Sequence, residues 1–225
     1  MKKRCPRCGS ELECLHNQPE QCWCMSVSLT PELREYLASN FEGCLCRSCL
    51  EELSLLYGGG RLLSSEHITT PVQIGRLAAL ADEVWHEFFV SILSAEQIDY
   101  MVDLFQSSRA LTVQIASGYE YYIFNSAGRN VGYTGIKAED GRLFLSKLYV
   151  SRQFRGQGFA SQALDFVIRR GRMLGCRAIW LTVNRHNLHA IDVYRHWGFE
   201  TLRAEVTDIG EGFVMDDFIM ELPLE

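Results

Sequence analysis

Residues 148–160 read LYVSRQFRGQGFA, the most informative segment of the sequence. An apolar strand ends here, a short loop with two glycines follows, and an amphipathic helix begins near Gln157. The first turn of a helix has unpaired N–H groups and a partial positive charge, so a pyrophosphate is a natural ligand there. Gly156 and Gly158 have no Cβ, which lets the backbone approach phosphate oxygens closely, and Arg155 adds positive charge. An ordinary strand-to-helix turn is the alternative interpretation of these glycines.

The pattern of apolar residues predicts the elements on either side of this segment. Thr70 can cap a helix that has Pro71 at its first position. Helical and strand periodicities then predict, in chain order, a faint strand within 62–69, helices 71–89 and from Ser94, strands 119–124, 130–137 and 142–150, helix 157–174, strand 178–183, helix 188–197 and strands 199–206 and 212–222. Two helices, a meander and β-α-β-α-β-β indicate an α/β (α+β) domain with a mixed central sheet flanked by helices.

A second motif, NRHNLHAIDVYRHWGF at 184–199, follows the strand predicted at 178–183. With it, the sequence resembles the GNAT acetyltransferase superfamily over about residues 65–224. The family's two motifs, Gln/Arg-x-x-Gly-x-Gly/Ala and Asn-x-x-Ala-x-x-x-Tyr-x-x-x-Gly-Phe, are matched by Gln153, Gly156 and Gly158, and by Asn187, Ala190, Tyr194, Gly198 and Phe199. The pattern is most similar to the spermidine/spermine acetyltransferases, and ribosomal-protein N-terminal acetyltransferases share much of it.

The resemblance implies that an acetyl group passes directly from acetyl-CoA to a primary amine, on either a polyamine-like molecule or a protein. Tyr194 matches the family's position for the general acid, and a phenol is protonated at neutral pH. Its plainer interpretation is a buried helix face with Ile191 and Trp197, while Asn187 could be a simple helix cap. The residues expected to hold acetyl-CoA are Leu148, Tyr149, Val150, Gln153, Arg155, Gly156, Gln157, Gly158, Phe159, Ala160 and Asn187.

Two further chemical roles follow from the resemblance. The tetrahedral oxyanion needs N–H donors, which the strand can supply near Leu148 and Val150. The general base stays unassigned, because many relatives carry a glutamate on this strand where the chain has LSKL at 145–148. The candidates for the base are Glu83, His86, His186 and His189.

The cysteines divide the chain into two parts. Eight of the nine precede Leu50, and Cys176 is expected to be a small core residue. The two-residue gap between Cys5 and Cys8 recurs between Cys46 and Cys49, which could form a four-thiolate zinc site, and the other four cysteines could form a second. The expected ligands of two zinc ions are Cys5, Cys8, Cys14, Cys22, Cys24, Cys44, Cys46 and Cys49.

Residues 5–50 resemble a small bacterial cysteine-rich family named for its Cys-Trp-Cys motif, here Cys22-Trp23-Cys24. Structural zinc, a disulfide cluster and a metal sensor are the alternatives. Structural zinc is favoured because so short a segment buries little core on its own. The expected organisation is a cysteine-rich module at 1–56, a glycine-containing linker at 57–64 and an acetyltransferase domain at 65–225.

Composition narrows the remaining classes of function. Hydrophobic residues make up 47% of the 225 residues, enough for a real core. A net charge of -6 and a pI near 5.6 argue against a general nucleic-acid binder. No apolar run reaches the ~18 residues of a membrane span, and we expect a cytoplasmic protein. The second candidate function is a CoA-sensing binding protein whose zinc module recruits a protein or nucleic acid. The oligomeric state stays open, a homodimer included.

Overall fold

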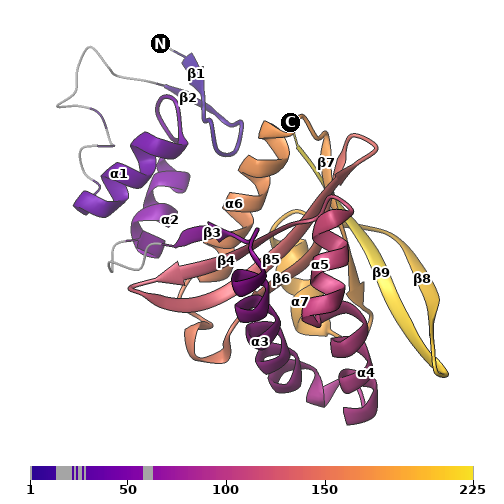
Figure 1. The fold of residues 1–225 in the computed structure, drawn as a ribbon. Coiled ribbons are helices and arrows are strands. Elements are labelled where there is room, and N and C mark those ends of the chain that lie inside the picture. The colour runs from indigo at the N-terminus through magenta and orange to yellow at the C-terminus, as the bar shows by residue number, and fades with distance from the viewer. Residues whose placement is uncertain are drawn as a thin grey trace. The chain divides into compact units, whose positions relative to one another are not determined.

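The computed structural model describes residues 2–13, 22, 24, 27, 29–57 and 63–224 (Figure 1). The chain divides into two compact units, with the main boundary between Ser64 and Ser65. We call them the N-terminal unit and the C-terminal unit. Every helix among the described residues is too short or too polar to traverse a bilayer.

The N-terminal unit contains two short strands and two helices. Its elements are β1 (Lys2–Arg4), β2 (Glu11–Glu13), α1 (Pro31–Asn40) and α2 (Arg47–Tyr57). β1 and β2 form an antiparallel hairpin, and the hydroxyl of Thr30 caps α1 by accepting from the N–H of Leu33. Neither helix was predicted from the sequence. The unit has a small apolar core made of Cys5, Leu12, Leu33, Leu45, Cys49, Leu50 and Leu53.

The C-terminal unit is built on a mixed seven-stranded sheet in the order β3-β4-β5-β6-β7-β9-β8. β6 and β7 are parallel, while the pairs β5–β6, β7–β9 and β8–β9 are antiparallel. The predicted α/β class is therefore confirmed. The elements are β3 (Ser64–His67), α3 (Pro71–Phe88), η3 (Phe89–Ser91), α4 (Ala95–Gln106), α5 (Ser108–Ala116), β4 (Glu120–Ser126), β5 (Arg129–Glu139), β6 (Arg142–Val150), η4 (Arg152–Phe154), α6 (Phe159–Met173), β7 (Ala178–Asn184), α7 (Leu188–His196), β8 (Glu200–Gly210) and β9 (Phe213–Pro223).

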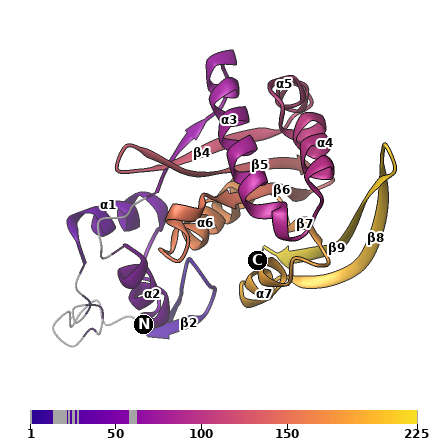
Figure 2. The same ribbon diagram turned by 90° about the horizontal axis from the view of Figure 1, so that it is seen from below.

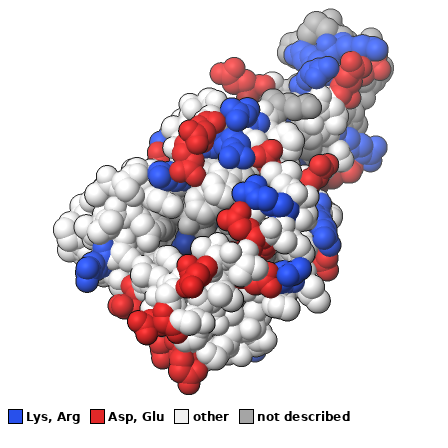
Figure 3. All heavy atoms as spheres, turned by 90° about the vertical axis from the view of Figure 1, so that its right-hand side faces the viewer, with Lys and Arg blue, Asp and Glu red and all other residues white. Residues whose placement is uncertain are grey.

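Helices cover both faces of this sheet (Figure 2). On one face, α6 and α7 pack through Val167 and Ile191 onto the apolar side chains of β6 and β7. On the other face, α3, α4 and α5 pack onto β4, β5 and β6. Because β6 contributes to both layers, ligands that reach it from either side meet at the same strand. Figure 3 shows one face of the molecule, on which acidic and basic side chains are interspersed and uncharged surface surrounds a hollow.

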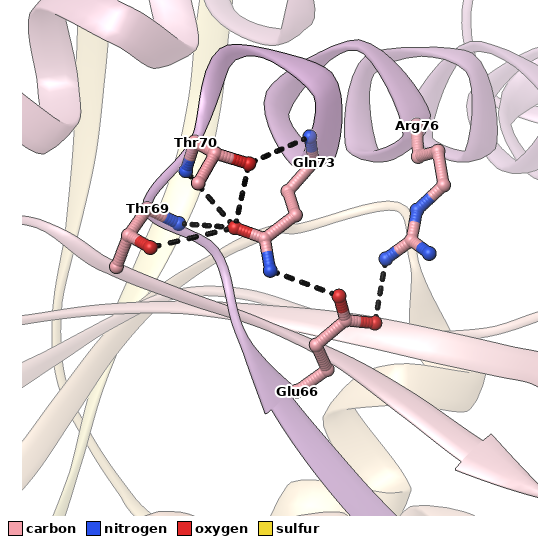
Figure 4. Close-up of polar contacts among 5 residues, drawn as sticks. All are labelled: Glu66, Thr69, Thr70, Gln73 and Arg76. Carbon is pink, nitrogen blue, oxygen red and sulfur yellow. Dashed lines mark hydrogen bonds and ion pairs between the residues drawn. The ribbon is translucent and has the colours of Figure 1, made fainter.

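The start of α3 is fixed by a network of side chains (Figure 4). The hydroxyl of Thr70 accepts from the N–H of Gln73, and the Gln73 carbonyl accepts from the N–H of Thr70 at 2.9 Å. This reciprocal capping box satisfies donors that a helix end leaves free. Glu66 of β3 accepts from Gln73 at 3.0 Å and from Arg76 at 2.5 Å, which ties the strand to the helix. The predicted Thr70 cap is confirmed.

Helix α5 was not predicted. Ser107 ends α4 and also caps α5, where its hydroxyl accepts from the N–H of Ala110 at 3.2 Å. The two helices therefore follow one another without a loop. Only Leu111 of α5 is buried, so the segment lacks the apolar periodicity that identified the longer helices.

Candidate active site

The sheet is split near its centre. The parallel strands β6 and β7 pair at Leu143 with Ile179 and at Phe144 with Trp180. Both strands continue past these positions, and among the described residues no further pairing joins them. The strand edges beyond Phe144 therefore face a gap, and their backbone N–H and C=O groups can bond a ligand.

A β-bulge lies where the two strands separate. Leu145 opposes Ile136 of β5 and Lys147 opposes Gly135, so Ser146 is an extra residue on β6. A bulge bends its strand and redirects the side chains that follow it. The bend takes β6 away from β7 and opens the split.

Two cavities meet at the split. The α7-side cavity has a volume of about 200 Å³ and lies between β6, β7 and α7. The α4-side cavity, of about 380 Å³, lies between the α3–α5 layer and strands β6, β7 and β9. The residues that line both cavities are Phe89, Ser146, Tyr149, Thr182 and Asn184. This arrangement lets two molecules approach the split from opposite faces of the sheet.

The glycine-bearing loop leads directly into α6. Gly156 and Gly158 have φ values of 70° and 81°, in the left-handed region that favours glycine. Gly158 is the N-cap, so α6 begins at Phe159 rather than at the predicted Gln157. No side chain caps this end in the described structure, and the N–H groups of the first turn remain available to an anion.

Two of the predicted loop contacts have protein partners. The Arg155 guanidinium forms a double ion pair with Glu87, at 2.6 and 3.0 Å, and donates to the carbonyl of Val150 at 2.9 Å. The Gln153 side chain accepts from Arg129 at 2.7 Å and lies outside the α7-side cavity. Arg155 does line that cavity, so its charge is near the split but already partly neutralised.

The other predicted CoA residues fall into two groups. Leu148, Tyr149, Val150 and Asn187 line the α7-side cavity. The loop and first turn of α6 hold Gly156, Gln157, Gly158, Phe159 and Ala160, with the Phe159 side chain buried against Phe154. The Asn187 side chain caps α7 by accepting from the N–H of Ala190 at 3.2 Å, as its plainer interpretation required.

Tyr194 projects from α7 into the α7-side cavity. Its ring packs edge-on against Trp197 and Phe199, with centroids 5.9 and 5.4 Å away. Burial raises the pKa of the phenol to about 12, so it is protonated at neutral pH. Within the described part of the chain no hydrogen bond occupies the hydroxyl, which leaves it free to donate to a ligand.

Of the four residues considered as general base, His189 alone lines the α7-side cavity. His86 contacts Asp82 and bonds Asp99 at 2.8 Å; the Asp99 hydrogen bond raises its pKa. Glu83 lines a separate surface hollow beside η4. His186 is exposed, and its backbone N–H donates to the side chain of Asn184.

Two charged residues that the sequence analysis did not select line the α4-side cavity. Asp217 of β9 is 9% exposed, and burial raises its pKa to about 6, although a hydrogen bond from Thr182 opposes the shift. Lys147 of β6 lies across the split, and burial lowers its pKa to about 8. Lys147 directly follows the bulge, but sheet order alone brings Asp217 to the same cavity, and the sequence carried no signal of that.

The N-terminal unit brings four thiols together. The Sγ atoms of Cys5, Cys8, Cys46 and Cys49 all lie within 4.8 Å of one another, with Cys8 and Cys46 at 3.6 Å. A tetrahedral zinc ion with Zn–S bonds of about 2.3 Å places its sulfurs about 3.8 Å apart, so this set fits zinc. Among the described residues, Cys5, Cys8, Cys46 and Cys49 form no disulfide, which does not favour the disulfide alternative for these four.

The other cysteines are less completely defined. Cys22 and Cys24 have their sulfurs 2.9 Å apart, and Cys44 interacts electrostatically with Cys24. Cys14, the fourth expected ligand of a second ion, lies outside the described residues. Cys176 is buried in the core between α6 and the sheet, as expected.

Comparison with protein families agrees with both motifs. The acetyltransferase (GNAT) family profile matches residues 77–199, more than half of the chain, and the chain belongs to this family. The cysteine-rich CWC profile matches residues 5–51. Both resemblances seen in the sequence are thus confirmed.

Individual relatives are distant. A spermine/spermidine N(1)-acetyltransferase of Bacillus subtilis is 27% identical over 63 residues, 28% of this chain and 41% of the relative. The chain therefore spans about two fifths of the length of the first relatives it matches. An uncharacterised N-acetyltransferase of Lactobacillus delbrueckii is 23% identical over 155 residues, covering 65% of this chain and 89% of the relative.

Solved structures share the fold. The PaiA N-acetyltransferase of Thermoplasma acidophilum, in complex with coenzyme A, superposes with a TM-score of 0.59 at 21% identity, covering 71% of this chain and 99% of the other. A GCN5-related N-acetyltransferase of Rhodopseudomonas palustris gives a TM-score of 0.60 at 14% identity, covering 73% and 96%. At these sequence identities, the similarity shows a shared fold and nothing more.

Proposed function

We propose that the chain is an acyl-CoA-dependent N-acetyltransferase that moves an acetyl group from acetyl-CoA to a primary amine. The observation that carries this proposal is the split between β6 and β7, where two cavities from opposite faces of the sheet meet. One cavity would take the thioester arm of acetyl-CoA and the other the acceptor. Family membership supports the same assignment.

Acetyl-CoA would lie along the α7-side cavity with its pyrophosphate at the uncapped start of α6. The N–H groups of the first turn, beginning at Phe159, would bind the phosphate oxygens. Arg155 would orient the loop through its bonds to Glu87 and Val150. Asn187 holds the start of α7, and through it the position of Tyr194.

The reaction joins nitrogen to carbon and releases sulfur. The neutral amine attacks the thioester carbonyl, a C–N bond forms, and the C–S bond breaks to release the CoA thiolate. Tyr194 would donate its hydroxyl proton to that sulfur and recover one from the ammonium nitrogen of the intermediate. Backbone N–H groups near Leu148 and Val150, at the open edge of β6, would stabilise the oxyanion.

The acceptor would enter through the α4-side cavity. Asp217 is anionic at neutral pH and would attract the ammonium form of the amine. It is also the carboxylate available to accept a proton there, since the relatives' glutamate on β6 is absent. Asp217 therefore replaces the four base candidates named from the sequence as the group that faces the acceptor.

We also propose structural zinc in the N-terminal unit. Cys5, Cys8, Cys46 and Cys49 would hold one ion as a closed four-thiolate site, which leaves no open position for catalysis. The remaining cysteines of the module would hold a second. Zinc would supply folding free energy to a unit that has a small core.

Release of free CoA thiol tests the proposed activity. Purified full-length chain is incubated with acetyl-CoA and a panel of primary amines and peptides, and the thiol is measured with and without each amine. We expect release that requires both an amine and the protein. Tight CoA binding with no release from any amine would favour the CoA-sensing binding protein instead.

A further inference from the structure

The α4-side cavity carries one positive and one negative side chain. Of the described residues that line it, Lys147 and Asp217 are the charged ones, and the others are apolar, aromatic or neutral polar groups. A cavity that simply took a cation would have carboxylates and no lysine. Its lining is instead balanced, with a net charge of zero when both groups are ionised.

The two charges are held apart by the sheet. Lys147 is on β6 and Asp217 is on β9, with β7 between them in the strand order. Two strand spacings put their backbones at least about 10 Å apart, and the split widens that distance. Asp217 sits opposite Asn184 of β7 in the strand register, beside the residues shared by both cavities. The two side chains form no ion pair with each other in the described structure, and each is available to a ligand.

Lys147 is poorly satisfied by the protein. Its Nζ atom lies 2.9 Å from the hydroxyl of Ser146, its own neighbour on the bulge. The cavity that Lys147 lines also contains the rings of Phe144, Tyr119 and Tyr149 and the neutral polar side chains of Gln97, Gln114 and Asn184. Lys147 is half-buried, and an ammonium group partly removed from water is destabilised unless an anion or several acceptors compensate it; burial accordingly lowers the pKa of Lys147 to about 8. Lys147 is still mostly charged at neutral pH, so an anionic ligand would replace the stabilisation by water that the ammonium group loses on burial.

We propose that the acceptor amine also carries an acidic group, which Lys147 binds while Asp217 holds the amino end at the split. This inference rests on the proposed acetyltransferase activity and narrows its substrate class to aminocarboxylates or aminophosphates. A polyamine fits the cavity poorly, because its several positive charges would meet one carboxylate and one opposing lysine. The spermine or spermidine named for the relatives is thus not the substrate class of this cavity.

Matched acceptor pairs test the inference. Lysine is compared with cadaverine and ornithine with putrescine, since each pair differs only by a carboxylate; phosphoethanolamine is compared with ethanolamine for a phosphate. Binding in the presence of CoA is measured by calorimetry, and kcat/KM by thiol release. We expect the acidic member of at least one pair to be preferred by tenfold or more. A preference in the lysine or ornithine pair would indicate a carboxylate on the acceptor, and a preference in the phosphoethanolamine pair would indicate a phosphate.

Three variants make the result specific to Lys147. Lys147→Met should reduce the preference within the pair to less than about threefold, Lys147→Arg should retain it, and Lys3→Met in the N-terminal unit should not change it. A wild-type preference for cadaverine, putrescine or ethanolamine, or an unchanged preference in Lys147→Met, would overturn the inference. Thermal melts verify that each variant is folded.

The two readouts separate this inference from the proposed function. If no amine releases thiol, the acetyltransferase proposal fails, and calorimetry still decides whether acidic amines bind through Lys147. If the non-acidic amines are acetylated as well as their acidic partners, acetyl transfer stands and the inference about the acceptor is wrong.

Discussion

The two units place their functional residues differently with respect to their cores. In the N-terminal unit, Cys5 and Cys49 belong both to the apolar core and to the four-thiol cluster. In the C-terminal unit, Gly158, Lys147 and Asp217 lie outside the buried apolar clusters, and Tyr194 packs only at the edge of one. A change in the small unit's site is therefore a change in its core. The large unit can lose a functional group and remain folded.

The largest effect is expected from breaking the thiolate cluster. Cys49→Ser should remove the ion bound by Cys5, Cys8 and Cys46 and unfold residues 29–57, because structural zinc supplies on the order of 10 kcal/mol in small zinc modules. Elemental analysis should show the loss of about one zinc per chain, and limited proteolysis should cut within α1 and α2. CoA affinity should be unchanged.

Cys176→Ser is the matched control, since Cys176 is buried outside the cluster. It should retain all of its zinc. A Cys49→Ser protein that keeps its metal and its protease resistance would show that the unit's core is sufficient without the cluster.

The next largest effect concerns the start of α6. Gly158→Asp places a side chain at a φ of 81° and a negative charge where the pyrophosphate is expected. Losing about two charge-assisted hydrogen bonds would weaken CoA binding roughly 100-fold. Gly175→Asp near the other end of the helix, at a φ of 70°, has the same backbone strain and should bind CoA normally. Equal CoA affinities of the two variants in calorimetry would refute the phosphate site.

Tyr194→Phe isolates the proposed general acid. The variant keeps the ring contacts with Trp197 and Phe199 and removes the hydroxyl, so kcat should fall on the order of 10²-fold with little change in CoA affinity or thermal stability. Tyr122→Phe is the comparison, because that hydroxyl bonds Glu120 away from the split and should matter for stability alone. A kcat within about threefold of the parent, with chemistry rate-limiting, would assign the acid to another group.

The pH dependence of KM for the amine should follow the ionisation of the Asp217 carboxyl group. Its pKa is raised to about 6, mainly by burial and also by Asp216 and Glu205, while the Thr182 hydrogen bond acts in the opposite direction. The carboxylate is charged above that pH, so KM for an amine should fall about tenfold from pH 5 to 7. A raised pKa also means that this group's contribution to stability is lost as pH rises from about 4 to 6.

Substitutions on β9 test whether Asp217 causes this fall in KM between pH 5 and 7, which we call the pH limb. Asp217→Asn should abolish it. Asp216→Asn removes a neighbouring carboxylate that pairs with Arg185, so the limb should persist and move to lower pH. A limb that survives unchanged in Asp217→Asn would belong to another group.

The smallest effect is expected at the cap of α3. Thr70→Ala removes the hydroxyl that accepts from the N–H of Gln73 and should lower the free energy of unfolding by about 1 kcal/mol. Denaturant unfolding measures it. Thr112→Ala, in the exposed middle of α5, is the control and should not destabilise. If both substitutions had equal effects, the capping box would contribute nothing measurable.

The sequence predicted the elements that carry strong local signals. The cap at Thr70, the glycines before α6 and the apolar strand β7 are each encoded within a few residues, and all appear where expected to within about two residues. Helix α5 was missed because it follows α4 without a loop and buries one leucine. Helices α1 and α2 were missed because the cysteines, rather than a helical pattern, dominate that segment.

The candidate site was predictable on one side of the sheet and not on the other. The loop, Asn187 and Tyr194 belong to local motifs, and six of the residues named from the sequence line the α7-side cavity: Leu148, Tyr149, Val150, Arg155, Asn187 and Tyr194. Lys147 and Asp217 are 70 positions apart in the sequence. Their common cavity depends on the strand order and on the bulge at Ser146, and neither can be derived from local spacing.

Hydrogen–deuterium exchange with and without CoA shows directly whether the split between β6 and β7 and the start of α6 form the CoA site. We predict slower exchange from Ser151 through the first turns of α6 and along the open edge of β6. The amides of residues 29–57 in the N-terminal unit, as the internal reference, should not change. CoA-dependent protection confined to other segments, with unchanged exchange at Phe159 and its neighbours, would contradict this assignment of the CoA site.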